Sequence, residues 1–147
     1  MARFPGEDIA MRHLLLPLAA GAALLLAGCA ANTRSDALTS TLTAYGNAVR
    51  WNGLQSGLQF VDPAELKAHP PTELDLARYQ QVRVSDYDDG AGPVPLGDNE
   101  VQQTVRISFI NIHTQAERSI TTRQVWRYDE KLKHWWLESG LPDIRQD

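Results

Sequence analysis

The spacing of apolar residues along the chain changes from helical to strand-like about halfway. In the first part, apolar residues recur at intervals of four, three and four, which marks one face of a helix: Leu38, Leu42, Tyr45 and Val49. Ser35 or Asp36 is a suitable N-cap for this helix. The segment Trp51-Asn52-Gly53 is predicted to end it.

Shorter helices are predicted to follow. The next one carries its apolar residues at Leu54, Leu58 and Val61 and ends near Asp62 and Pro63. Residues 64–68 form a further turn, and Thr72 caps a short helix that continues to Arg78.

From Tyr79 onward the pattern alternates with the period of two that is typical of strands. Strands are predicted over 79–87, 101–113, 118–129 and 134–141, and a Gly/Pro/Asp-rich loop over 88–99. The inward-facing positions are Val82, Val84, Val105, Ile107, Phe109, Ile120, Trp126, Tyr128, Trp135 and Leu137. After Phe109 the apolar positions switch to Ile110 and Ile112, which indicates either a bulge or a strand covered on both faces.

Short connections between the strands imply antiparallel pairing. The sequence therefore predicts an α+β domain, in which N-terminal helices pack on one face of a four-stranded antiparallel meander sheet.

The N-terminal segment has the pattern of a processing signal. The apolar run 14–27 follows Arg12 and His13 and is shorter than the about 20 residues that a membrane-spanning helix needs. It ends in Leu26, Ala27, Gly28 and Cys29, which resembles the lipobox of bacterial lipoproteins. That resemblance implies a diacylglyceryl thioether on Cys29, cleavage before it and acylation of the new amino terminus. The alternative is an ordinary buried cysteine in an apolar helix.

These features divide the chain into three parts. Residues 1–28 are predicted to be a lipoprotein signal peptide, residues 29–34 a lipidated tether and residues 35–147 a single domain. Translation is expected to start at Met11, because Glu7 and Asp8 are unusual in a positively charged leader. By resemblance to enterobacterial sorting, Ala30 after the cysteine implies a periplasm-facing protein anchored to the outer membrane by its lipid.

Composition excludes some classes of protein. The net charge of −4 argues against a nucleic-acid-binding protein, and a single cysteine excludes a disulfide within the chain. His69, His113 and His134 show no metal-ligand spacing, and the acidic loop 86–100 does not fit a calcium-binding loop. We therefore expect no metal and no cofactor.

The order of the elements resembles the NTF2-like, cystatin-like cone fold over roughly residues 36–141. Residues 45–62 resemble the opening helices of that superfamily, and residues 123–128 with 135–137 resemble its last, tryptophan-rich hairpin. The resemblance implies a pocket inside the cone. Its members include isomerases, dehydratases, ligand-binding proteins and interaction modules, so the fold does not decide the function.

The candidate pocket residues are Tyr45, Trp126 and Trp135. Tyr45 falls where ketosteroid isomerases of this superfamily carry a tyrosine that stabilises an oxyanion. No carboxylate base can be assigned to accompany it, so the catalytic residues stay unknown. The alternative is a core tyrosine whose hydroxyl is bonded locally, beside tryptophans that simply fill the core.

The candidate partner face is the outward side of the sheet, which is predicted to carry Arg83, Arg106, Arg123, Val125, Arg127 and Trp136. Arginine and tryptophan are enriched at protein interfaces. This face would take a second copy of the chain or an envelope protein, with anionic polymers or lipid headgroups as further candidates. The alternative is a solvated face with cross-strand pairs such as Arg127 with Glu138.

The function expected from the sequence is a binding or interaction module anchored to the outer membrane. The partner is a protein at the sheet face or a small apolar ligand in the cone. The alternative is an isomerase or hydratase that uses Tyr45.

Overall fold

The computed structural model describes residues 31–145. The predicted signal peptide, including Leu26, Ala27, Gly28 and Cys29, lies outside the described residues. The chain divides into two compact units, residues 1–36 and 37–147. The second unit contains the sheet and the shorter helices.

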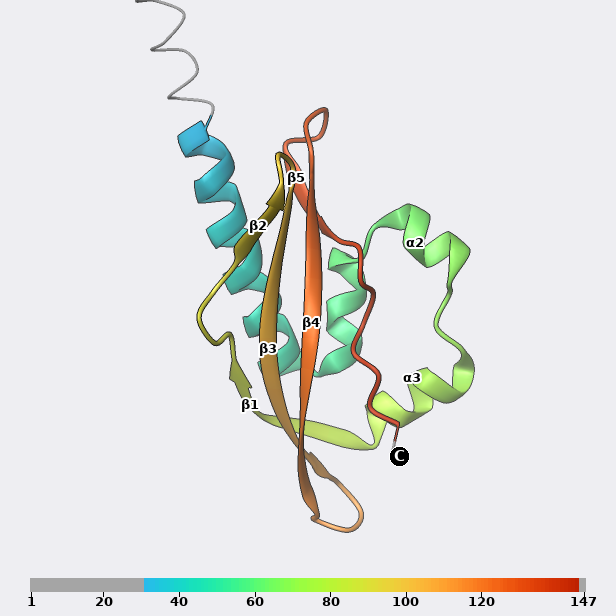
Figure 1. Cartoon of the computed structure of the whole chain (residues 1–147). Coiled ribbons are helices and arrows are strands. Elements are labelled where there is room, and N and C mark those ends of the chain that lie inside the picture. Colours follow the sequence, from blue (N-terminus) through green and yellow to red (C-terminus); the bar gives the residue numbers. More distant parts are fainter. Residues whose placement is uncertain (1–30, 146–147) are drawn as a thin grey trace, which may run out of the picture. The chain divides into compact units, whose positions relative to one another are not determined.

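A long helix covers residues 31–52 and is the blue-to-teal ribbon in Figure 1. It is already formed at residue 31, so the predicted start at Ser35 or Asp36 is wrong. The predicted end is confirmed: Gly53 has a positive φ of 87° and donates its N–H to the carbonyl of Val49. Glycine suits this position because residues with a side chain rarely adopt a positive φ.

Three short helices follow, and capping residues define where α2 and α3 begin. Residues Leu54–Phe60 form a 3₁₀ helix, η1, where a second helix is predicted. Helix α2, Pro63–Ala68, begins where Asp62 accepts the N–H of Ala64 at 2.7 Å. Helix α3, Glu73–Gln80, begins with a capping box in which Thr72 and Asp75 bond each other's backbone N–H. The predicted helical turns over 64–68 and 72–78 are confirmed.

One antiparallel sheet contains the strands, in the order β1-β3-β4-β5, with β2 also paired to β3. Their bounds are β1 Val82–Asp88, β2 Val94–Gly97, β3 Glu100–Asn111, β4 Glu117–Asp129 and β5 His134–Leu137 (Figure 1). The α+β class and the antiparallel sheet are confirmed. Strand β2 lies inside the predicted loop 88–99, so the sheet has five strands instead of four.

The pairing of β3 with β4 is regular from Glu100 opposite Arg127 to Ile110 opposite Glu117. The bulge, one of the two alternatives predicted for the switch after Phe109, is therefore absent from this pair. An irregularity lies in β1 instead, between Val84 and Asp86.

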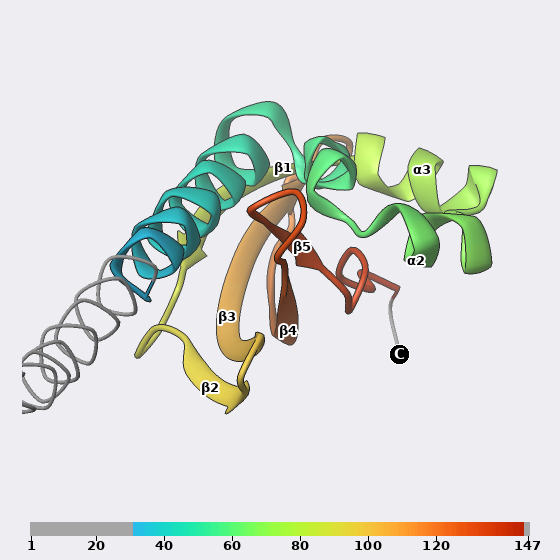
Figure 2. The same cartoon turned by 90° about the horizontal axis from the view of Figure 1, so that it is seen from above.

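The inner face of the curled sheet forms the core (Figure 2). Alternate residues of β3, β4 and β5 are buried there, as the period of two predicts. They pack with residues from the long helix and η1 in one cluster that includes Tyr45, Val49, Leu54, Val105, Ile107, Phe109, Trp126 and Leu137. Burying each such side chain contributes about 1.5–3 kcal/mol, so this cluster is the main stabilising feature.

The outer edge of β5 is covered by the chain that leaves η1. Val61 forms a parallel bridge with Leu137, and the N–H of Asp62 donates to the carbonyl of Leu137 at 3.0 Å. This contact protects one sheet edge from pairing with another chain.

Candidate functional site

The predicted arginines on the outer face of the sheet differ in whether a carboxylate pairs with them. Arg83 and Arg123 are exposed and make no hydrogen bond or ion pair with any side chain of residues 31–145. Arg106 lies 3.7 Å from the carboxylate of Asp88, a loose pair with both side chains about half exposed. Such a pair contributes little to stability, so three guanidinium groups remain available to a ligand.

The guanidinium group of Arg127, in contrast, is already bound by two carboxylates of the domain. Its Nε donates to Glu138 at 2.6 Å, and its Nη2 binds Asp62. The hydrogen bond to Glu138 is the main cause of a raised pKa at Arg127. The predicted alternative of an Arg127–Glu138 pair is thus confirmed, and the arginine joins β4 to the start of α2.

Val125 and Trp136 are half-buried. Trp136 lies opposite Arg127 in the register, and its ring contacts the edge of His134 at 4.3 Å. The six predicted face residues therefore separate into three arginines that are unpaired or loosely paired, on β1, β3 and β4, and three residues near β5 that are held by contacts within the domain.

The predicted pocket residues are deeply buried. Tyr45 and Trp126 have no exposed surface and meet edge to face at 5.3 Å. Trp135 packs instead on Tyr128, at 5.1 Å. The structure brings Tyr45 and Trp126 together, while the ring contact of Trp135 is made elsewhere in the core.

The hydroxyl of Tyr45 makes no hydrogen bond within the described chain. Burial raises its pKa well above the ordinary range, and the neighbouring hydroxyls of Tyr87 and Tyr79 act in the same direction. The amide of Gln124 opposes this shift. The hydroxyl is therefore a neutral group that retains its capacity to donate a hydrogen bond.

Two buried glutamines lie beside this tyrosine and were not singled out from the sequence. Gln103 and Gln124 face each other across β3 and β4 and are only 3% and 2% exposed. Gln124 Oε1 accepts from Trp126 Nε1 at 3.3 Å and from Gln103 Nε2 at 3.4 Å. Gln124 also donates to the hydroxyl of Tyr87 at 3.3 Å. The signal was present, because both glutamines occupy inward positions of alternating strands.

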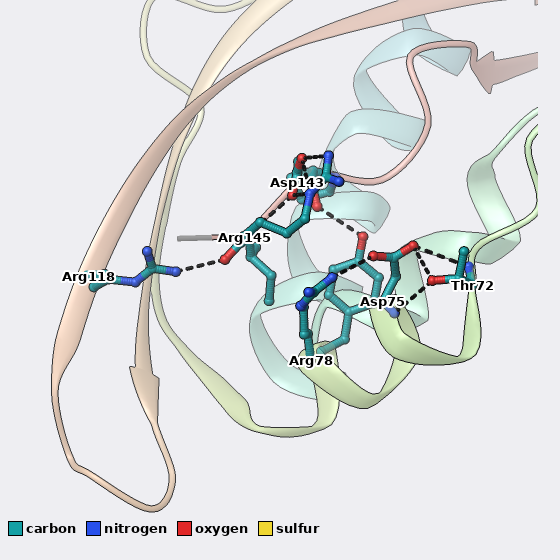
Figure 3. A network of polar contacts seen from close by, with 9 residues as sticks. Thr72, Asp75, Arg78, Arg118, Asp143 and Arg145 are labelled. Carbon is teal, nitrogen blue, oxygen red and sulfur yellow. Dashed lines mark hydrogen bonds and ion pairs between the residues drawn. The ribbon is translucent and has the colours of Figure 1, made fainter. Parts of the chain in front are cut away.

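A separate cleft of about 310 Å³ lies where α2 and α3 approach the C-terminal segment. Its apolar lining includes Leu58, Val61, Leu66, Pro70, Pro71 and Leu141. Its charged groups have partners. Glu65 pairs with His69. Asp143 pairs with Arg145, and Asp75 pairs with Thr72 and Arg78 (Figure 3). The hydrogen bonds from Arg145 lower the pKa of Asp143 to about 2. The cleft thus offers a ligand no unpaired charge.

The C-terminal segment is fixed beside the cleft by two bonds to its carbonyls. Tyr79 donates its hydroxyl to the carbonyl of Pro142 at 2.9 Å, and Arg118 donates to the carbonyl of Ile144 at 2.8 Å. Figure 3 shows Arg118 reaching this segment from the sheet. Neither this cleft nor a second, shallow one beside Asp62 and Arg127 is lined by Tyr45, Trp126 or Trp135.

Residues 31–145 contain no group of three or more histidine, cysteine or acidic residues that is arranged to hold a metal. His113 lies beyond the end of β3 that pairs with the start of β4, whereas His134 begins β5 opposite the end of β4. No helix in the same range is long and apolar enough to cross a membrane.

Comparisons of the chain with family models, curated proteins and solved structures found no match.

Removing the Tyr45 hydroxyl is expected to stabilise the fold. A buried hydroxyl without a partner costs free energy, so Tyr45→Phe should raise the free energy of unfolding by about 1 kcal/mol. Tyr79→Phe is the matched control, because it removes a hydroxyl that does have a buried partner, Pro142. It should lower the free energy by about 1 kcal/mol. Equal losses in both variants, measured by urea unfolding, would contradict the assignment.

Proposed function

We propose that the protein is a lipoprotein anchored to the outer membrane through Cys29, whose periplasmic domain binds an anionic partner on the outer face of its sheet. The main support for this binding site is that the arginines of the face differ in their partners. Arg127 is neutralised by two carboxylates, whereas Arg83 and Arg123 are exposed without partners. Exposed guanidinium groups on a protein of net charge −4 offer local binding sites for negative ligands.

The chemistry of that face favours a polar partner. Along β3 and β4 the arginines alternate with hydroxyl groups, and the hydroxyls of Ser108 and Ser119 lie 2.8 Å apart across the strands. Guanidinium groups bind carboxylates and phosphates through paired hydrogen bonds. An acidic protein surface, including that of a second copy, or an anionic envelope polymer would fit these groups.

The test uses photo-crosslinking residues placed at Thr104 and Ser119, on the outer face, in cells that produce the full chain. Adducts are expected at both positions, and the double change Arg83→Ala with Arg123→Ala should weaken them several-fold. Lys67→Ala with Arg145→Ala removes the same charge away from the sheet face and should leave the adducts unchanged. Equal adduct yields in the two double variants would exclude an arginine-dependent partner.

We also propose that the domain is a cone of the NTF2-like kind. The support is the long helix, whose Tyr45 packs against Trp126 on the inner face of a curled antiparallel sheet. Residues 63–80 form α2 and α3 before the first strand, an arrangement that gives the chain its separate cleft.

A second candidate function is an isomerase or hydratase that uses Tyr45. The specific support is the buried hydroxyl, which is neutral and has no partner within the described chain. Native mass spectrometry of protein purified gently from periplasm tests this candidate and a binding cone together. A discrete extra mass that is lost on denaturation, and lost in Tyr45→Phe, supports a ligand at this hydroxyl. Protein without such a mass favours the sheet face.

A further inference from the structure

One end of the sheet carries exposed apolar side chains, on the β4–β5 turn and on strand β2 with the turn that follows it. The β4–β5 turn presents Leu132 with 65% of its surface exposed, and strand β2 presents Val94 at 54% and Leu96 at 45%. Exposed apolar side chains that gather at one end of a domain mark a candidate site of interaction, and an apolar edge strand normally has a cover.

The leucine is held at the tip of its turn by a defined set of bonds. The carboxylate of Asp129 accepts the N–H groups of Lys131 at 2.9 Å and Leu132 at 3.0 Å, and Lys133 has a positive φ of 55°. These backbone bonds lower the pKa of Asp129, which keeps the carboxylate ionised. Turn tips are usually occupied by polar residues, so a leucine at this tip is unusual.

The two apolar groups belong to the same end of the domain. Strand β2 leads directly into the turn before β3, and the carbonyl of Asn99 in that turn accepts the N–H of Tyr128 at 2.8 Å. Tyr128 stands at the base of the β4–β5 turn. Both turns lie at the upper end of the sheet in Figure 1.

The part of the long helix that belongs to the second unit, residues 37–52, begins at this end (Figure 1). Its C-terminal part contacts β1 through Arg50, which lies 3.2 Å from Asp86. Five residues earlier, Tyr45 reaches Trp126, whose strand partner Val101 also pairs with β2. The helix therefore runs from the end with the apolar turns toward the opposite end, as its colours show in Figure 1.

The chain before the compact unit is too short to separate this end from an anchor at Cys29. Eight peptide units connect Cys29 to Ala37, the first residue of the compact unit. Even a fully extended chain of that length spans only about 26–29 Å. A lipid on Cys29 thus brings the adjacent end of the domain within reach of the bilayer surface.

We infer that these turns form a membrane-facing end, in which Leu132, Leu96 and Val94 enter the interface of the bilayer that holds the anchor. Lys131 and Lys133 flank the leucine and match anionic headgroups, while their aliphatic stems lie along the acyl boundary. Apolar side chains buried about 5–10 Å into the boundary between headgroups and acyl chains add to the attachment through Cys29 and orient the domain. The outer sheet face then remains accessible from the periplasm. This inference rests on the anchor of the proposed function.

The test exploits the single cysteine of the chain. Once Cys29 is lipidated, Leu132→Cys introduces the only free thiol, which takes an environment-sensitive fluorophore. Ala116→Cys is the matched control, because this exposed residue lies in the β3–β4 turn at the opposite end. The purified lipoproteins are placed in vesicles of phosphatidylethanolamine and phosphatidylglycerol that contain nitroxide lipids.

We expect several-fold stronger quenching, with a blue-shifted emission, at position 132 than at position 116. Leu96→Cys should behave like Leu132→Cys. Equal quenching at 132 and 116 overturns the membrane-facing end. So does a blue shift at 132 that is already present without vesicles, because it indicates a protein partner such as a second copy.

A separate measurement shows whether Cys29 carries a lipid at all. If it carries none, the unsubstituted chain reacts with the fluorophore at Cys29 and takes up no labelled palmitate. The turns are then tested in the Cys29→Ser background, where flotation with the same vesicles is expected to fall several-fold on Leu96→Ser with Leu132→Ser. Unchanged flotation overturns the inference independently of the anchor.

Discussion

Replacing Cys29 by serine is expected to abolish membrane attachment. The lipobox resemblance implies that the thiol is the attachment point of the diacylglycerol and that cleavage before residue 29 requires this modification. Cys29→Ser should therefore accumulate as an unprocessed precursor that takes up no labelled palmitate. Each buried acyl CH₂ contributes about 0.8 kcal/mol, so the loss of several chains changes membrane affinity by orders of magnitude.

The measurement is palmitate labelling followed by gel electrophoresis and mass spectrometry of the amino terminus. Ala31→Ser is a suitable control, since it makes a similarly small change two residues further on and should leave processing intact. Labelled protein of mature size from Cys29→Ser would contradict the lipoprotein assignment. An unlabelled wild-type chain would do the same.

The helix and strand patterns were readable because each element has a single buried side. Residues of β3 and β4 alternate between buried and exposed along most of their length, which is the geometry of a sheet with one covered face. Strand β2 was missed for the opposite reason. It is short, exposed throughout and contains Pro95, a residue that a sheet tolerates at an edge because it lacks an N–H to donate.

The polar core was harder to predict than the apolar core. Glutamines at inward positions interrupt the alternation of apolar and polar residues. Their burial is explained only by the hydrogen bond between them. Gln103 and Gln124 are separated by 21 positions in the sequence and face each other by the register of β3 with β4. Register follows from the whole hydrophobic pattern of a strand pair and not from either glutamine alone.

The cleft could not be predicted at all. Its walls come from the segment 58–79 and from residues 139–145, which no local pattern connects. The same is true of Arg127 with Asp62, which are 65 positions apart. The sequence did suggest Arg127 with Glu138, since neighbouring antiparallel strands bring such residues together.

Replacing Asp62 by alanine is expected to lower the free energy of unfolding by about 2–3 kcal/mol. This carboxylate is only 7% exposed and has two functions. It caps α2 through the N–H of Ala64, and it binds Arg127 of β4. Loss of a cap costs about 1 kcal/mol. The ion pair adds about 1–2 kcal/mol, less than for a fully buried pair because Arg127 keeps a third of its exposure.

Two further variants separate these contributions in urea unfolding followed by tryptophan fluorescence. Asp62→Asn keeps an N-cap acceptor but loses the charge, so it should lose about half as much free energy as Asp62→Ala. Asp86→Ala removes an exposed carboxylate that pairs with Arg50, and it should change the free energy by less than about 0.5 kcal/mol. If Asp62→Ala unfolds like Asp86→Ala, then Arg127 does not fasten α2 to the sheet and returns to the set of arginines available to a partner.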